Sequence, residues 1–180
     1  MLLPPKPIST ENPFQQWGLD FIGEIHPPSS GQHKWILTAT DYFTKWIEVI
    51  PTRQATNSVI ISFIESNILS RFGCPHNIIT DNPTAFKSRK MISFCHKYHI
   101  TLGHSTAYYP QGNGLAESSN KSLINIVKKL LQENKKTWNK KLVYALWVDR
   151  LTTKKSIRTS PYHIVYGMDA VFPLPYVFQS

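Results

Sequence analysis

Hydrophobic and polar residues follow two periods along this chain, first that of strands and later that of helices. β-Branched and aromatic residues dominate 17–25, 34–40 and 45–50, with turn residues between them, which predicts three consecutive antiparallel strands. Further along, apolar residues recur every three or four positions, as they do in amphipathic helices. Helices are expected on this basis at 57–72, 89–98, 115–132, 137–151 and 160–167, and short strands at 77–80 and 100–102.

The order of these elements predicts an α/β fold, because strands come first and helices then alternate with strands before two final helices. Four prolines in residues 1–13 indicate an extended N-terminal arm. We therefore expect an arm at 1–13, a folded core at 14–155, and a C-terminal extension at 156–180 that holds a short helix and a tail.

The charge of the chain indicates an anionic partner. Twenty Lys and Arg residues against eleven Asp and Glu residues give a formal net charge of +9 and an isoelectric point near 9.6. Nucleic acid is the first expectation for so basic a domain, and a membrane surface the second. No apolar run approaches the roughly 18 residues of a membrane span, and the first residues lack the apolar segment of a signal peptide. A soluble intracellular protein is expected.

Two cysteines set no disulfide framework. Cys74 and Cys95 each have histidines nearby, at His76 and at His96 and His99. A zinc site needs ligand pairs that can close a tetrahedron, and the pair at 74 and 76 is too tightly spaced for that. Two buried thiols are favoured over a zinc site.

Three of the eleven acidic residues stand out from the pattern around them. Asp20 lies inside an apolar strand, Asp81 directly follows a short buried strand, and Glu117 lies in the first turn of the long helix. Taken singly, Asp81 is better explained as a helix N-cap and Glu117 as a first-turn acid that matches the helix dipole. Two acids from strands and one from a helix start also form a common arrangement for holding a pair of hard divalent cations between phosphate oxygens.

The residues around these acids resemble the catalytic core of retroviral and long-terminal-repeat retrotransposon integrases. Asp20, Asp81 and Glu117, with thirty-five residues (82–116) between the last two, resemble the D, D-35-E triad of that family. The matching segments are WGLDFIG at 17–23, DYFTKW at 41–46, TDN at 80–82 with Phe86, YPQGNGLAESSNK at 109–121, and SPYHIVYG at 160–167. The last of these is similar to the segment after the core in gypsy-type retrotransposons.

This resemblance implies an RNase H-like fold, a five-stranded mixed sheet with helices on both faces. It implies that Asp20, Asp81 and Glu117 are the catalytic residues and bind two Mg²⁺ or Mn²⁺ ions, with no small-molecule cofactor. The implied function is that of a transferase and nuclease for DNA integration, which trims the 3′ ends of the element's DNA and joins them to target DNA. The implied partners are DNA and further copies of the chain, with no membrane, and the implied location is the nucleus.

Residues near the third acid are the candidates for DNA contacts. They are Gln111, Asn113, Asn120, Lys121 and Lys128. Lys121 and Lys128 share a helix side with Glu117, and a lysine there can meet a phosphate as a point charge. Without the neighbouring motifs, a surface Glu–Lys pair at i, i+4 would be the better explanation of Lys121. The lysines at 135, 136, 140 and 141 are either a phosphate-contacting face or a solvated one.

The chain departs from the family pattern at Pro83, where a glycine is usual after the Asp-Asn pair. Proline fixes φ and removes an N–H in a turn beside a metal ligand. The His2Cys2 zinc domain that precedes the core in the family is also missing, as is a complete C-terminal domain. The alternative function is therefore a catalytically impaired, integrase-derived remnant that only binds nucleic acid.

Overall fold

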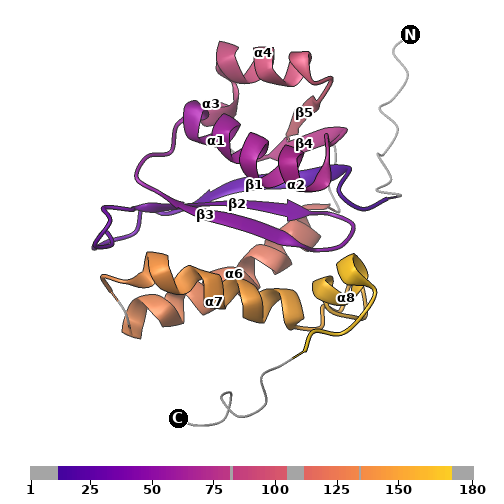
Figure 1. Cartoon of the computed structure of the whole chain (residues 1–180). Coiled ribbons are helices and arrows are strands. Elements are labelled where there is room, and N and C mark those ends of the chain that lie inside the picture. Colours follow the sequence, from indigo (N-terminus) through magenta and orange to yellow (C-terminus); the bar gives the residue numbers. More distant parts are fainter. Residues whose placement is uncertain (1–11, 82, 105–111, 134, 172–180) are drawn as a thin grey trace.

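The computed structural model describes residues 12–81, 83–104, 112–133 and 135–171 and has three layers, with a mixed sheet between two sets of helices (Figure 1). The strands of this five-stranded sheet are β1 (Gln16–Ile22), β2 (Trp35–Asp41), β3 (Ile47–Thr52), β4 (Asn77–Thr80) and β5 (Thr101–His104). Their order across the sheet is β3-β2-β1-β4-β5. β2 is antiparallel to both β1 and β3, whereas β4 is parallel to both β1 and β5.

Helices cover both faces of the sheet, as Figure 1 shows. On one face lie α1 (Asn57–Phe63), the π-helical segment η1 (Ile64–Leu69), α2 (Ser70–Phe72), α3 (Pro83–Phe86) and α4 (Arg89–Lys97). On the other lie α6 (Gly112–Glu133) and α7 (Trp138–Leu151). The short helix α8 (Pro161–Tyr166) follows α7 in the chain and packs against the core cluster on the α1 side. Among these helices, none is both long and apolar enough to cross a membrane. The α/β fold expected from the sequence is confirmed, including helices on both faces.

Local sequence signals explain where the helices begin and end. The hydroxyl of Thr56 accepts a hydrogen bond from the Val59 N–H at the start of α1, and Ser88 and Ser160 cap α4 and α8 in the same way. Gly73, at φ 87°, ends the helical run that began at Asn57, because glycine adopts positive φ without a steric penalty. Helix 57–72 is thus confirmed, with its middle turn wound as a π-helix.

The alternation of residues along β1, β2 and β3 divides the core into two clusters. Trp17, Leu19, Leu37 and Ala39 face the α1 layer, where they pack with Ile60 and Phe63. Ile36, Ile47 and Val49 face the other layer and pack with Leu123 and Val127 of α6 and Trp138 of α7. Both faces of the sheet are therefore buried, which is the usual state of sheets that contain parallel strands.

The C-terminal helix α8 packs against the core. The Tyr166 ring lies 5.8 Å from that of Trp46, and Tyr162 and Val165 pack against the core cluster on the α1 side. The division into an arm, a core to residue 155 and a C-terminal extension stays a prediction. The arm lies largely outside the described residues, as do residues 172–180 of the extension.

Three details differ from the sequence-based expectations. Cys95 is buried, and burial raises the pKa of its thiol to about 11, but Cys74 is exposed, so the expectation of two buried thiols is wrong for Cys74. Helix α3 was not expected. Glu48 is only 4% exposed, although glutamates are rarely buried, because helical segments and Arg150 enclose it from both sides of β3.

Candidate active site

Two of the three candidate catalytic acids meet at one end of the sheet. β1 and β4 pair in parallel with Gly18 beside Ile79 and Leu19 beside Thr80. Continuing this register by one residue places Asp20 beside Asp81. Neighbouring strands are about 4.8 Å apart, and residues in register point to the same face of the sheet. The alternation that buries Leu19 toward α1 directs Asp20 to the opposite face, where α6 lies, and the Asp81 carboxylate is near enough to act on the Asp20 carboxyl.

Asp20 occupies a partly buried position suited to binding a cation. Burial raises the pKa of its carboxyl, and the nearby Asp81 carboxylate raises it further. A hydrogen bond of 2.8 Å from the Phe21 backbone N–H to Oδ1 opposes both effects. Among the described residues, no lysine, arginine or histidine pairs with Asp20. The partly buried Asp20 carboxyl beside a second carboxylate favours a positively charged ligand, since a cation offsets both the burial of Asp20 and the repulsion between the two acids.

The third acid, Glu117, lies in α6, on the helix that covers the face carrying Asp20 and Asp81. Its side chain is outside the described part of the structure, so its convergence with the other two stays a prediction. Within the described residues, no group of three or more His, Cys, Asp or Glu side chains could hold a metal ion. The hard oxygen ligands of Asp20 and Asp81 fit a divalent metal ion.

The candidate DNA-contacting residues lie on or just before α6. Lys121 and Lys128 are exposed, whereas Leu123 and Val127 are buried against the sheet, as in an amphipathic helix. The side chains of Asn113 and Asn120 lie outside the described residues, and so does the whole of Gln111. DNA contact by these five residues stays a prediction.

Sequence reasoning missed a neighbour of the acids. The Thr38 hydroxyl, fully buried on β2, donates a hydrogen bond of 3.2 Å to the backbone carbonyl of Asp20. Thr38 lies directly across from Asp20 in the β1–β2 register, so the bond ties the two strands together beneath the acid. A threonine in a β-branched strand gives no local signal of such a role, because the role depends on register.

Pro83 lies in a more favourable place than the sequence indicated. It is the first residue of α3, rather than part of an irregular turn. Proline is favoured in the first helical turn, where its φ near −65° suits the helix and its missing N–H would have no intrahelical partner. The expected disturbance of the segment after Asp81 is therefore reduced.

Comparison with known proteins agrees with this geometry. The family model described as "Integrase core domain" matches residues 10–110. The Gag-Pol polyprotein of avian reticuloendotheliosis virus is 31% identical over 156 residues, which is 87% of this chain and 13% of the polyprotein. The chain thus spans about an eighth of that relative.

Two solved structures share the fold. One is the simian T-cell lymphotropic virus intasome in complex with PP2A regulatory subunit B56 gamma, with a TM-score of 0.69, 21% identity, and coverage of 93% of this chain and 58% of that chain. The other is the HTLV-2 integrase catalytic core domain in complex with magnesium, in a trimeric form, with a TM-score of 0.64 and 24% identity over 84% of this chain and 96% of that one. The chain belongs to the integrase core domain family and has the RNase H-like fold of retroviral integrase catalytic cores.

Proposed function

We propose that the chain is the catalytic core of an integrase, a polynucleotidyl transferase that trims the 3′ ends of an element's DNA and joins them to target DNA. The observation that carries this proposal is the proximity of the Asp81 carboxylate to the partly buried Asp20, at the end of the sheet where β1 and β4 run in parallel. In so basic a chain, a partly buried aspartate with a purely structural role would be expected to recruit a lysine or arginine. Asp20 has none among the described residues.

In the proposed site, Asp20, Asp81 and Glu117 hold two Mg²⁺ or Mn²⁺ ions. When bound, such ions activate the attacking oxygen and stabilise charge on the leaving oxygen of a phosphodiester. The protein's part is to hold the carboxylates in place. Asp20 is fixed by its strand, by the Phe21 N–H and by the Thr38 bond to its carbonyl. The exposed Lys121 and Lys128 on α6 supply positive charge for DNA phosphates.

The test measures Mn²⁺-dependent strand transfer on a duplex that mimics an element end, with plasmid nicking as a readout that needs no particular end sequence. Asp81→Asn and Glu117→Gln are expected to lower both activities by at least about 100-fold, the order seen when one electrostatic group is removed from an active site. Asp169→Asn, at an exposed residue beyond α8, is the matched control and should keep both.

Mn²⁺ binding, followed by calorimetry, is a second readout and should weaken in the same two variants. Activity that survives Glu117→Gln, or that needs no metal, would contradict the proposal. DNA binding by the parent chain without any strand transfer or nicking would instead favour the catalytically impaired remnant.

We further propose that the chain self-associates through α7. Large apolar side chains on this helix are 42% to 61% exposed, and they are Val143, Tyr144, Trp147 and Val148. A contiguous exposed apolar face of this kind marks an interaction surface. The solved relative described as trimeric supports a second copy as the occupant. Trp147→Glu should shift the chain to the monomer in light scattering, whereas an unchanged mass would contradict this assignment.

The type of mobile element and the cellular location of the protein are two further predictions. The relatives found here are retroviral, so the assignment to a gypsy-type retrotransposon stays a prediction based on residues 160–167. Nuclear localisation stays a prediction as well, since it follows from joining DNA to chromosomes. Imaging of the tagged chain in cells would test it.

A further inference from the structure

A second basic surface lies at the same end of the sheet as the acids, but at its β3 edge. β1 and β3 run in the same direction, so the end of β3 and the segment after Asp20 emerge together. Arg53 directly follows β3. Its Nε donates a hydrogen bond of 3.0 Å to the carbonyl of Gly31, in the loop between β1 and β2. The remaining guanidinium nitrogens have no carboxylate partner in the described part of the chain.

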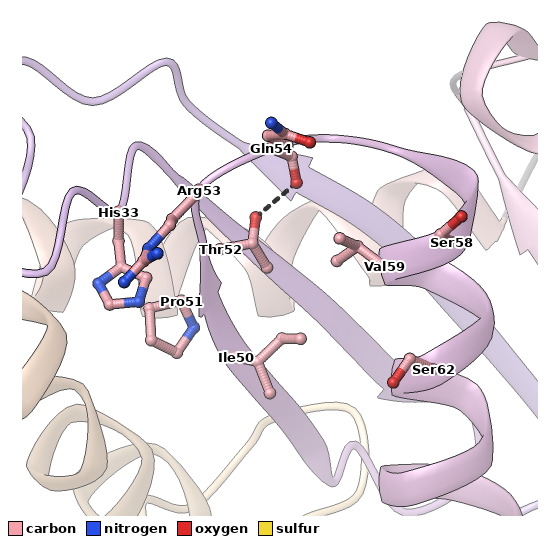
Figure 2. Close-up of a pocket in the computed structure, with 9 residues that line it drawn as sticks. All are labelled: His33, Ile50, Pro51, Thr52, Arg53, Gln54, Ser58, Val59 and Ser62. Carbon is pink, nitrogen blue, oxygen red and sulfur yellow. Dashed lines mark hydrogen bonds between the residues drawn. The ribbon is translucent and has the colours of Figure 1, made fainter.

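An open hollow of about 610 Å³ adjoins Arg53 (Figure 2). Its lining consists of His33, Ile50, Pro51, Thr52, Arg53, Gln54, Ser58, Val59 and Ser62. In Figure 2 the Arg53 and His33 side chains lie on one side of the hollow, and the hydroxyls of Ser58 and Ser62 on the other. Burial and the Arg53 cation both lower the pKa of His33, so the fixed positive charge of this rim is that of Arg53.

Exposed lysines continue this positive charge on the other side of the same loop. The Ser30 N–H donates to the Lys136 carbonyl at 2.7 Å, and the His33 ring lies 6.5 Å from that of Trp138 at the start of α7. The segment from 135 to 141 carries Lys135, Lys136, Lys140 and Lys141, all exposed and without a carboxylate partner among the described residues. Arg53 and these four lysines are called here the β3-end basic surface.

This clustering contrasts with the ion pairs found elsewhere. Lys34 pairs with Glu24, Arg150 with Glu48, and Lys154 with Asp149. The first turn of α7 also carries lysines and no acid. Positive charge there destabilises the helix, because the N-terminal end of the helix dipole is itself positive. Unpaired cations gathered in this way cost stability through mutual repulsion, and an anionic partner removes that cost.

The position of this surface suits the DNA that would reach the acids. Asp20 lies across from Thr38, and Thr38 from Val49, so Arg53 is two strand spacings across and four residues further along. At about 4.8 Å per strand and 3.3 Å per residue, Arg53 is roughly 16 Å from Asp20. This distance corresponds to about five base pairs of duplex DNA.

We propose that the β3-end basic surface binds backbone phosphates of the DNA duplex that enters the active site, about five base pairs from the reacting phosphodiester, with the sugar–phosphate strand lying over the hollow. This proposal rests on the proposed function, since it extends the DNA path of the same site. It assigns Arg53 and Lys136 as phosphate contacts, which bind without reading sequence.

The test compares two double variants that remove the same charges, one Arg and one Lys each. Arg53→Gln with Lys136→Gln alters the surface, and Arg158→Gln with Lys155→Gln is the matched control in the exposed loop beyond the other end of α7. Binding of a fluorescent 20-base-pair duplex is measured from 50 to 200 mM salt. Each lost phosphate contact should lower the salt slope by about 0.9 and, near 0.1 M salt, the affinity by up to about eightfold.

A selective loss in the first double variant, with a slope lower by nearly two, is the expected result. Equal losses in both variants, or none, would overturn the proposed surface and leave the active site untouched. Failure of the parent chain to bind DNA would overturn the surface and the proposed function together. If the Arg53→Gln, Lys136→Gln variant lost binding to phosphatidylserine vesicles but bound DNA as the parent does, the surface would be a membrane-binding surface and the proposal would be overturned.

Site-specific cross-linking distinguishes direct contact of residue 53 with DNA from a general effect of the net charge. Arg53→Cys in a Cys74→Ser background should exchange with a mixed disulfide tethered to the backbone about five base pairs from the joined end, which links the protein to the DNA and releases the small leaving thiol. Cross-linking that is as efficient at every tether position, or absent at this one, would contradict the assigned path.

Discussion

Glu48 is expected to be one of the largest single contributors to the stability of this fold. Its carboxylate is nearly enclosed and accepts a hydrogen bond of 2.9 Å from the Trp46 indole. Arg150 of α7 and Arg71 of α2 each reach it at 3.2 Å, and Asn67 of η1 donates to it at 3.3 Å. One carboxylate thus joins the helices on both faces of the sheet to β3.

Truncating this side chain leaves its partners without a counter-charge. Arg150 is only 20% exposed, burial lowers the pKa of its guanidinium, and Glu48 offsets that effect. Removing one member of a buried ion pair costs about 3–5 kcal/mol. The pair with Arg71 adds little, because that side chain is 48% exposed and screened by water. Glu48→Ala should therefore lower the free energy of unfolding by about 3–5 kcal/mol, or the Tm by about 6–20 °C for a chain of this size.

Urea unfolding followed by far-UV circular dichroism measures this difference. Glu48→Gln should cost less, because the amide oxygen still accepts from Trp46. Glu65→Ala, at an exposed residue of η1, is the matched control and is expected within about 0.5 kcal/mol of the parent. The double variant Glu48→Gln with Arg150→Gln should lose less than the sum of its single variants. A Glu48→Ala chain within 1 kcal/mol of the control would refute the reasoning.

Three further outcomes are expected. At pH 8, iodoacetamide should modify Cys74 in the native chain and spare Cys95, whose thiol pKa is about 11, and equal labelling by mass spectrometry would contradict this. Pro83→Gly should not raise Mn²⁺-dependent strand transfer and should lower stability by about 0.4–1 kcal/mol, because Pro83 starts a helix; a large gain in rate would restore the view that this proline impairs the site. Burial raises the pKa of Asp149 despite Lys154, so ionisation of this carboxyl opposes folding as the pH rises above about 4. The unfolding free energy of Asp149→Asn relative to the parent should therefore increase from pH 4 to pH 7. A constant or decreasing difference would contradict this prediction.

The sequence by itself determined the elements and the family. Period-two and period-3.6 patterns, serine and threonine caps, and Gly73 are local signals, and they predicted most elements of the structure within a few residues. The acid motifs were readable as well, because each lies in a short segment whose residue types are tied to one place in the fold. Helix α3 escaped prediction since four residues carry too little periodicity.

Tertiary structure alone decided which polar groups are buried and which meet. Glu48 shares a strand face with Trp46 and Ile50, and this face is covered by helices, so the usual expectation of an exposed polar position fails there. The pairing of Asp20 with Asp81 depends on the parallel register of β1 and β4, whose residues are about sixty positions apart. Arg53 and Lys136, which are far apart in the sequence, both bind the loop between β1 and β2. Such contacts join distant segments, and their energies depend on burial and register, which no local pattern encodes.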